Sequence, residues 1–279
     1  GHKVTLFDAA GEIGGQFNLA KRVPGKEEFY ETIRYFSKQI ELNGVRMKLN
    51  TRVEAQDLID GNYHEVILAT GVTARDVTFP GADHEKVLSY IDVLRHKKPV
   101  GKKVAVIGAG GIGFDISEYL VHNEGEAPSL DVALWQKEWG IDKTLKQPGG
   151  LAKKGKQPTA PARQIYLCQR KETKVGGGLG KTSGWVHRTT LLDKNVEMIA
   201  GVTYDKVDDK GLHITVNGQA GVLEVDNVIT CAGQVPCREL YAALQAAGVN
   251  THLIGGADVA SELDAKRAIR QGSELAAEL

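Results

Sequence analysis

The sequence has few cysteines, no net charge and no long apolar run, and each absence excludes a class of protein. Only three of its 279 residues are cysteine, and they form no C-x-x-C pair, so neither a disulfide framework nor a recognisable metal or iron–sulfur ligand set is predicted. Thirty-five basic residues balance 35 acidic ones, which predicts no nucleic-acid or anionic-membrane partner. No apolar run could span a bilayer. We therefore expect a cytoplasmic protein whose thiols are free.

What is present is an alternation of strand and helix patterns. The β-branched run at 3–7 predicts a strand buried on both faces. Apolar residues at helical spacing predict a helix over 26–43 that stops at Gly44. Further strands are predicted at 45–50, 64–71, 103–107, 163–171, 226–234 and within 252–258.

Three other regions complete the pattern. Short segments near 202–207, 211–216 and 221–225 predict an antiparallel meander. The stretch 123–162 is rich in Lys, Gly, Pro and Gln and is predicted to be an irregular insertion. A helix from about Asp264 to Leu279 closes the chain.

Two segments, at 66–71 and 228–233, share the same pattern of an apolar strand followed by a glycine turn. Such segments are typical of the points where a chain crosses between two interleaved dinucleotide-binding domains. We therefore predict an α/β protein of two interleaved Rossmann-like domains, one formed by residues 1–95 and 235–279 and the other by 100–234. The first is expected to lack its initial strand and glycine loop, since the chain starts at what reads as a second strand.

The clearest motif follows the strand at 103–107. Gly108, Gly110, Gly111 and Gly113 form a G-x-G-x-x-G turn with a strand before it and an amphipathic helix after it. The glycines of such a motif serve the tight turn, the close approach of backbone to a pyrophosphate, and helix–sheet packing. The turn therefore predicts nucleotide binding, against the alternative of a purely structural glycine turn.

Basic residues follow the strand predicted at 164–168. Arg170 and Lys171 stand at its end, where cations suit the 2′-phosphate of NADPH. The alternative is a solvated basic edge, and Asp131, in a stretch that could also begin a strand, is the competing candidate for the usual ribose-binding acid. Lys174 and Lys181 can add to the phosphate site or remain exposed loop charges.

The start and the end of the chain carry candidate FAD contacts. Asp8 ends the first strand and is followed by an E-x-G-G-Q turn that includes Gln16. Asp258 follows the last strand, where a carboxylate can bind a ribityl hydroxyl, unless it serves as a helix cap or Asx turn. The helix start near Leu263 to Lys266 can direct amide groups at the flavin pyrimidine ring.

The order of these motifs resembles a known family. The strings that carry the resemblance are GGQF, ILATG, VIGAGGIGFD, EWGID, QRK, GLGKTSGWVHRTTLL, AGQ and LIGGADVASELDAKRAI. They resemble the C-terminal region of the bacterial iron–sulfur flavoprotein type of 2,4-dienoyl-CoA reductase, over essentially the whole chain. The resemblance implies that NADPH reduces FAD here, and that an upstream barrel and cluster domain of the parent chain carry FMN and a 4Fe–4S cluster.

The resemblance also implies site residues. The FAD contacts it implies are Asp8, Gln16, Lys26, Val53, Gly71 and Asp258. The NADPH contacts it implies are the 108–113 turn, Arg170, Lys171 and Lys181. It implies no residue in this chain that acts on the acyl substrate, and packing and turn roles are expected for Trp139 and Asp142.

The sequence therefore predicts the electron-input part of an NADPH-dependent dienoyl-CoA reductase of unsaturated fatty acid β-oxidation. Two alternatives stay open: a catalytically silent NADP-binding fragment, and another flavin oxidoreductase of this fold. A dithiol-using disulfide reductase is disfavoured because the C-x-x-C pair is absent. We expect the chain alone to lack dienoyl-CoA reductase activity and to hold FAD weakly or not at all.

Overall fold

The chain forms two compact units in a computed structural model that describes residues 1–261 and 264–279. Unit 1 consists of residues 1–17, 30–75 and 233–279, and unit 2 of residues 18–29 and 76–232. The chain thus passes between units shortly after the first of the two similar strand–glycine segments, between residues 75 and 76, and at the last residue of the second, between residues 232 and 233. The boundaries differ from the predicted ones, because residues 18–29 and 76–95 belong to unit 2.

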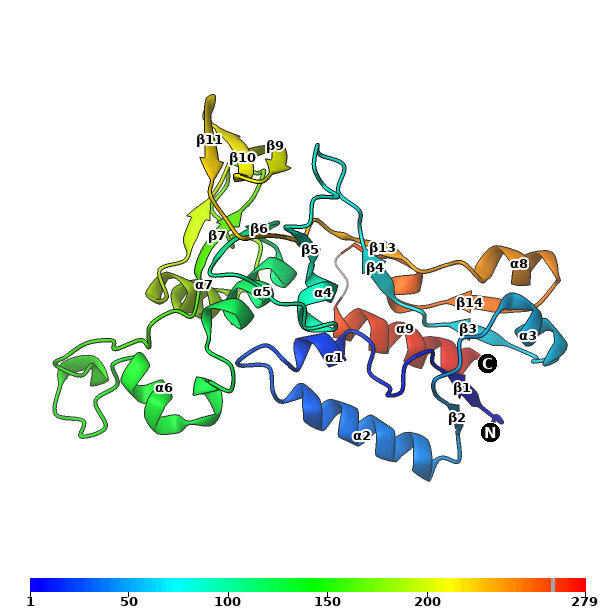
Figure 1. Ribbon diagram of the computed structural model, residues 1–279. Helices are drawn as coiled ribbons and strands as arrows, with labels where there is room; N and C mark the ends of the chain where they lie inside the picture. The colour runs from blue at the N-terminus through cyan, green and yellow to red at the C-terminus, as the bar shows by residue number, and fades with distance from the viewer. Residues whose placement is uncertain (262–263) are drawn as a thin grey trace. The chain divides into compact units, whose positions relative to one another are not determined.

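Unit 2 is built on a five-stranded parallel sheet in the order β5–β12–β6–β7–β8 (Figure 1). In β6 and β7, Val106 lies opposite Leu167, and both side chains are fully buried. This pairing confirms that the strand predicted at 164–168 lies next to the strand that precedes the glycine turn. The strands are β5 (Val87–Ser89), β6 (Lys103–Ile107), β7 (Gln164–Cys168), β8 (Glu197–Ile199) and β12 (Asn227–Thr230).

Helices α5 and α7 pack against each other, and α5 also packs on β6 and β7. The core face of α5 is apolar, with Phe114, Ile116 and Leu120 almost completely buried. The predicted strand–turn–helix unit is therefore confirmed. The helices outside the insertion that lie wholly or mainly in this unit are α1 (Phe17–Ala20), α4 (Tyr90–Leu94), α5 (Gly111–Val121) and α7 (Gly184–Asp193).

The predicted meander is also confirmed. It consists of β9 (Val202–Asp208), β10 (Gly211–Val216) and β11 (Gln219–Leu223), all antiparallel. Its inner side chains share one core with the sheet, formed by Ala105, Ile107, Cys168, Val202, Val207, Leu212, Ile214, Val225 and Val228. The register shifts between His213 and Ile214, so that Asp205 is the extra residue of a bulge on β9.

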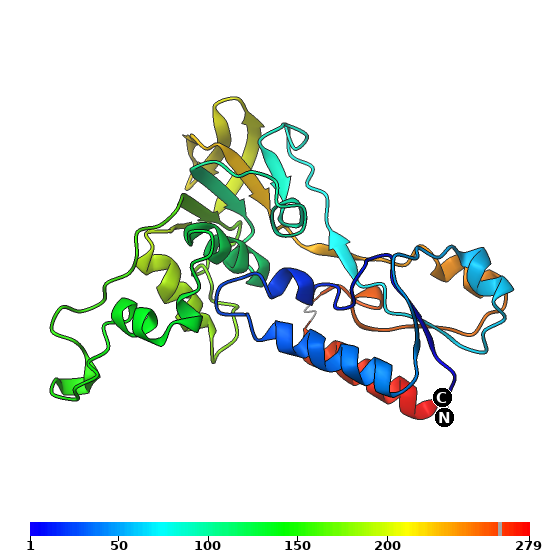
Figure 2. The ribbon, with the colours of Figure 1, turned by 60° about the horizontal axis from the view of Figure 1, so that its bottom comes forward.

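The insertion at 123–162 is more ordered than its composition predicts. It contains η1 (Pro128–Leu130), α6 (Val132–Glu138) and η2 (Pro148–Gly150) and extends away from the sheet of its unit in both views (Figures 1 and 2). The possible strand at Asp131 is wrong, because the Asp131 carboxylate accepts the amides of Ala133 and Leu134 and so caps α6.

Buried charge and aromatic packing attach the insertion to α7. The Lys194 ammonium, which is 2% exposed, lies 3.1 Å from the Glu138 carboxylate. Trp139 packs against Trp135 and Trp185, with ring centroids 5.9 and 6.0 Å apart. The chain has three tryptophans, and they therefore form a single cluster.

The described residues of unit 1 form three separate two-stranded ladders. β1 pairs with β2 and β14 with β3, both in parallel, and β13 pairs with β4 in antiparallel. The strands are β1 (Thr5–Phe7), β2 (Arg46–Lys48), β3 (Val66–Leu68), β4 (Val72–Ala74), β13 (Gln234–Pro236) and β14 (Thr251–Leu253). The helices are α2 (Phe29–Leu42), α3 (Ala55–Asp60), α8 (Tyr241–Ala246), η3 (Gly255–Ala257) and α9 (Ala265–Glu278).

One core cluster of unit 1, among the described residues, consists of Leu58, Val66, Leu68 and Leu244. The prediction that β1 is buried on both faces is wrong, because its three residues are only half-buried and the preceding Val4 is 50% exposed. Within the described residues β1 has a ladder partner on one edge alone, and that partner, β2, is exposed.

Candidate dinucleotide-binding site

The glycine turn lies at the carboxyl ends of β6 and β12, where the strand order of the sheet reverses. Gly108 has φ +102°, a conformation that favours glycine, and an added Cβ would lie 2.4 Å from the Cys231 carbonyl oxygen. An added Cβ on Gly113 would lie 1.8 Å from the carbonyl oxygen of Gly108. These two glycines are therefore required by the packing of the turn itself. Ligands of open α/β sheets bind at such reversal points.

Gly110 and Gly111 differ from the other two glycines of the motif. An added Cβ on either would meet no protein atom within 4 Å. α5 begins at Gly111, so its first amide groups and its dipole are directed at this open space. A side chain would fill a space that a pyrophosphate can use, and the turn therefore fits the pyrophosphate of NAD(P)H.

The basic residues predicted to bind the 2′-phosphate follow β7. Arg170, Lys171 and Lys181 are exposed, and none of them forms an ion pair in the part of the chain that the structure describes. The Lys171 carbonyl oxygen accepts the amide of Gly201 at 3.0 Å, which fixes the backbone at this end of the sheet. Free cations on a fixed backbone suit a phosphate group, and their role in NADPH binding stays a prediction.

Charged side chains follow the glycine turn along α5. Asp115 accepts hydrogen bonds from the Lys26 ammonium at 2.6 and 2.8 Å. One turn later, Glu118 lies 2.9 Å from Nδ1 of His187 on α7, and this hydrogen bond raises the pKa of the imidazole. Lys26 was predicted to contact FAD, but it belongs to unit 2 and its ammonium is paired there. The sequence reading missed this charge network because its members are far apart in the chain.

Three of the predicted FAD contacts lie in the first half of unit 1. Asp8 follows β1, and its Oδ1 accepts the amide of Ala10 at 2.8 Å. Gln16 donates from Nε2 to the carbonyl oxygen of Val72 at 3.3 Å, next to the predicted contact Gly71. Val53 is half-buried against the core of unit 1. Gln16 therefore lies next to Gly71, whereas the described residues show no hydrogen bond from Asp8 or Val53 to either of them.

Gly71 and Asp258 follow two strands that pair with each other, β3 and β14. Gly71 has φ +76°, and an added Cβ would meet no protein atom within 4 Å, so the backbone is open to a close ligand. The Asp258 carboxylate accepts a hydrogen bond from Nε2 of Gln271 at 2.8 Å. These residues fit the ribityl and ring end of FAD. The sequence reading missed Gln271, whose only signal is its place in the helix after Asp258.

The helix that follows Asp258 begins close to where it was predicted. α9 starts at Ala265, and the Asp264 carboxylate caps it by accepting the amide of Arg267 at 2.7 Å. Of the predicted flavin-facing start, Leu263 lies outside the described residues. The packing and turn roles expected in the insertion are confirmed, since Asp142 accepts the amides of Thr144, Lys146 and Gln147.

The cysteines do not form a reactive thiol pair. Cys168, Cys231 and Cys237 are free thiols. Burial raises the pKa of Cys168 to about 12 and also raises the pKa values of Cys231 and Cys237. Thiolate is the nucleophilic form, so these residues do not fit dithiol chemistry.

Residues 1–261 and 264–279 contain no group of three or more His, Cys, Asp or Glu side chains placed to hold a metal ion. None of their helices combines the length and the apolar character that crossing a bilayer requires.

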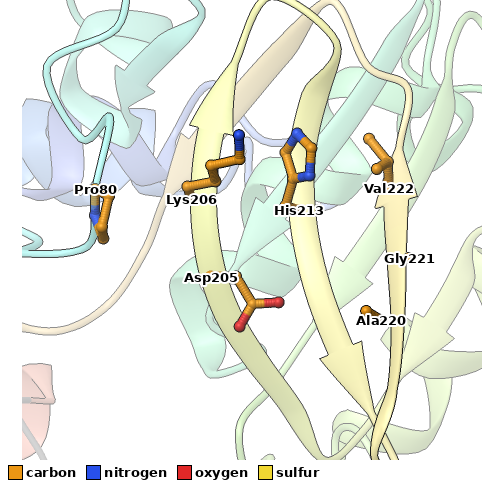
Figure 3. A pocket seen from close by; sticks show the side chains of 7 residues that line it. All are labelled: Pro80, Asp205, Lys206, His213, Ala220, Gly221 and Val222. Atoms are coloured by element: carbon orange, nitrogen blue, oxygen red, sulfur yellow. The ribbon is translucent and has the colours of Figure 1, made fainter.

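A surface hollow of about 390 Å³ lies on the outer face of the meander. Figure 3 shows Lys206 of β9 and His213 of β10 side by side in it. Both side chains bind Asp208, at 2.8 Å each, so both already have a partner within the protein. None of the predicted site residues lines this hollow, and we do not assign the nucleotide site to it.

Comparison with known proteins agrees with this geometry. Residues 1–267 match the family described as pyridine nucleotide-disulphide oxidoreductase. The chain is 27% identical over 263 residues to the cinnamate reductase of Clostridium sporogenes and 25% identical over 267 residues to the metal reductase of Desulforamulus reducens. Each alignment covers 92% of this chain but only 33% and 38% of these relatives. The chain therefore spans about a third of the length of these curated relatives.

Two solved structures share the fold. One is a 2-naphthoyl-CoA reductase in complex with 2-naphthoyl-CoA, with a TM-score of 0.80, 22% identity and coverage of 100% of this chain and 36% of that chain. The other is the histamine dehydrogenase of Rhizobium sp. 4-9, with a TM-score of 0.74, 18% identity and coverage of 100% and 40%. With the family match and the glycine turn, these findings show that the chain belongs to the pyridine nucleotide-disulphide oxidoreductase family and has its FAD- and NAD(P)H-binding fold of two Rossmann domains.

Proposed function

We propose that this chain is the electron-input part of an NADPH-dependent 2,4-dienoyl-CoA reductase of the iron–sulfur flavoprotein type. NADPH, when bound, supplies a hydride, and FAD, when bound, accepts it. The single observation that carries the nucleotide part is the pair Gly110 and Gly111. Added side chains there would meet no protein atom within 4 Å, directly in front of the start of α5.

The chain's own residues divide the binding work in this proposal. In unit 2 the glycine turn holds the pyrophosphate of NADPH, and Arg170, Lys171 and Lys181 bind its 2′-phosphate. In unit 1 the Asp258 carboxylate accepts a ribityl hydroxyl of FAD, and the open backbone at Gly71 lies against the flavin. The remaining predicted contacts of unit 1 bind the adenosine and pyrophosphate part of FAD; they are Asp8, Gln16 and Val53. Lys26 is not assigned to FAD, because it lies in unit 2 and is paired with Asp115.

The acyl substrate is supported by two sequence findings. The motif strings of this chain resemble those of the dienoyl-CoA reductase family, and a curated relative at 27% identity is a cinnamate reductase. Cinnamate carries a double bond conjugated to a carboxyl group, as a 2,4-dienoyl thioester carries conjugated double bonds next to its carbonyl. The proposal places FMN, a 4Fe–4S cluster and the acyl site in other parts of the full-length protein.

The cofactor assignment is tested by titration. Isothermal calorimetry with NADPH and NADH should show NADPH binding at least about ten-fold more tightly, because a hydrogen bond to a charged group contributes about 1.5–3 kcal/mol. Arg170→Ala should remove most of this preference. Arg34→Ala is the matched control, since Arg34 is an exposed arginine of α2 paired with Glu31. Equal affinities for the two nucleotides in the unmodified protein would contradict the choice of NADPH.

The enzymatic part needs a second measurement. A full-length protein that contains this chain, loaded with FAD, should lose its oxidised flavin absorbance when NADPH is added without oxygen. It should then oxidise NADPH with 2,4-hexadienoyl-CoA faster than with cinnamate. NADPH binding without flavin reduction would identify a silent nucleotide-binding fragment instead, and the opposite substrate preference would contradict the acyl-CoA assignment.

A further inference from the structure

The hydroxyl group of Tyr204 is buried and has no hydrogen-bond partner among the described residues. Tyr204 lies on β9 opposite Ile214 of β10, directly before the bulge at Asp205. Its ring packs against the core that contains Ile107 and Cys168, the last residues of β6 and β7. Buried polar groups in native proteins are almost always satisfied, and an exception calls for an explanation.

Three polar groups influence this phenol: the thiol of Cys168, the guanidinium of Arg170 and the backbone amide of Gly108. The Cys168 thiol is itself a donor, to the carbonyl oxygen of Tyr166 at 3.8 Å. The Gly108 amide already donates to the carbonyl oxygen of Cys168 at 2.9 Å, and a guanidinium has no acceptor atom. Burial raises the pKa of Tyr204 above its ordinary value, so the phenol stays protonated and can donate. Its missing partner is therefore an acceptor.

Packing alone does not call for a hydroxyl at this position. The Tyr204 ring has an aromatic neighbour, Phe79, at a centroid distance of 6.5 Å, and its other neighbours in this core are mostly aliphatic. A phenylalanine would fill the same volume without leaving a buried donor unsatisfied. The hydroxyl lies at the carboxyl ends of β6 and β7, which is where the adenosine ribose of a dinucleotide binds in this type of sheet.

We propose that Tyr204 donates a hydrogen bond to the adenosine 2′-phosphate of NADPH and, together with Arg170, selects NADPH over NADH. This inference rests on the proposed function and deepens it. A phosphate oxygen supplies the acceptor that the protein lacks, and its charge strengthens the bond. Arg170, whose side chain is exposed, is the neighbour that can move to admit the phosphate.

The test combines nucleotide affinity with stability. Dissociation constants for NADPH, NADH and 2′,5′-ADP are measured by calorimetry for the unmodified protein, Tyr204→Phe and Arg170→Ala. Tyr166→Phe is the matched control, because the Tyr166 hydroxyl on β7 already has a partner, Nε2 of Gln164 at 2.6 Å. The melting temperature of each protein is recorded with and without 2′,5′-ADP.

Tyr204→Phe should weaken NADPH and 2′,5′-ADP by about ten-fold, as expected for a hydrogen bond to a charged group, and leave NADH unchanged. Without ligand its melting temperature should stay equal or rise, because an unsatisfied hydroxyl is removed, while the stabilisation by 2′,5′-ADP should shrink. A lower melting temperature with unchanged affinities would show a merely structural tyrosine and overturn the inference. Equal weakening of NADPH and NADH would also overturn it.

The two proposals can fail separately. If the unmodified protein binds NADPH and NADH equally, the proposed cofactor itself is wrong. If it prefers NADPH and Arg170→Ala loses that preference, while Tyr204→Phe keeps it, only the role of Tyr204 is wrong.

Discussion

Gln271 of α9 holds Asp258 to the turn that precedes it. Its Nε2 donates to Oδ2 of Asp258 at 2.8 Å, and its Oε1 accepts the amide of Gly255 at 2.8 Å. One side chain therefore fixes both the carboxylate proposed to bind the ribityl chain of FAD and the backbone of the turn that carries it. Such supporting contacts hold a binding group in place before the ligand arrives.

Removing this support should weaken FAD binding. In Gln271→Leu both hydrogen bonds are lost, and at about 0.5–1.5 kcal/mol each the FAD dissociation constant should rise about five-fold or more. Release of FAD on dilution of a full-length protein that contains this chain, followed by flavin fluorescence, measures the effect. Gln245→Leu, an exposed glutamine of α8, is the control and should leave FAD affinity unchanged. Equal FAD affinity in both variants would show that Gln271 does not support the site.

Two glycines of the same motif should respond in opposite ways to alanine. Gly113→Ala places a Cβ 1.8 Å from the Gly108 carbonyl oxygen, so it should lower the free energy of unfolding by about 1–3 kcal/mol or more. Gly111→Ala meets no protein atom and gains helix propensity, so its stability should stay equal or rise by less than about 1 kcal/mol. Its NADPH affinity should nevertheless fall. Urea unfolding and calorimetry separate the two effects, and unchanged NADPH affinity in Gly111→Ala would place the pyrophosphate elsewhere.

The buried charge between the insertion and α7 should control stability. Lys194 is 2% exposed, and Glu138 is its ion-pair partner at 3.1 Å. Lys194→Met leaves a buried carboxylate without its cation, which costs about 3–5 kcal/mol. Trp139, the half-buried member of the tryptophan cluster next to Glu138, should become more hydrated, and the tryptophan fluorescence should shift to longer wavelength. Lys38→Met, at an exposed lysine paired with Glu41, should cost less than about 1 kcal/mol. A similar cost for both variants would contradict the structure.

The pair of His187 and Glu118 should make stability depend on pH. The hydrogen bond to Glu118 raises the pKa of His187, with Asp115 adding to the effect and burial and Lys26 opposing it. A raised folded-state pKa stabilises the protein fully below the unfolded value of about 6.5, and this stabilisation is lost as the pH rises through the raised value.

Glu118→Gln should therefore destabilise the protein by about 1–3 kcal/mol below pH 6.5 and by less above it. Urea unfolding between pH 5.5 and pH 8.5 measures the difference, with Glu31→Gln at an exposed site on α2 as the control. A difference that does not change with pH would show that the imidazole is not charged in this pair.

Local patterns were sufficient to predict most of the elements. The strand, glycine turn and helix at 103–121 have their own periodicity and turn residues, and the meander at 202–223 is delimited by its turns. The Rossmann fold class followed from the order of these elements and is confirmed. Each of these features depends on residues within about 20 positions of one another. Patterns of this short range can be recognised in a single sequence.

Tertiary structure alone decided the features that join distant segments. The ion pair of Lys26 with Asp115 spans 89 positions, and the pair of Glu118 with His187 spans 69. The unsatisfied Tyr204 hydroxyl arises where the meander packs on the sheet near Gly108. The half-buried state of β1 and the capping role of Asp131 likewise depend on what packs or does not pack around them. Each of these segments could adopt several local conformations, and contacts with residues far away in the sequence select one of them. These contacts are therefore visible only in the folded chain.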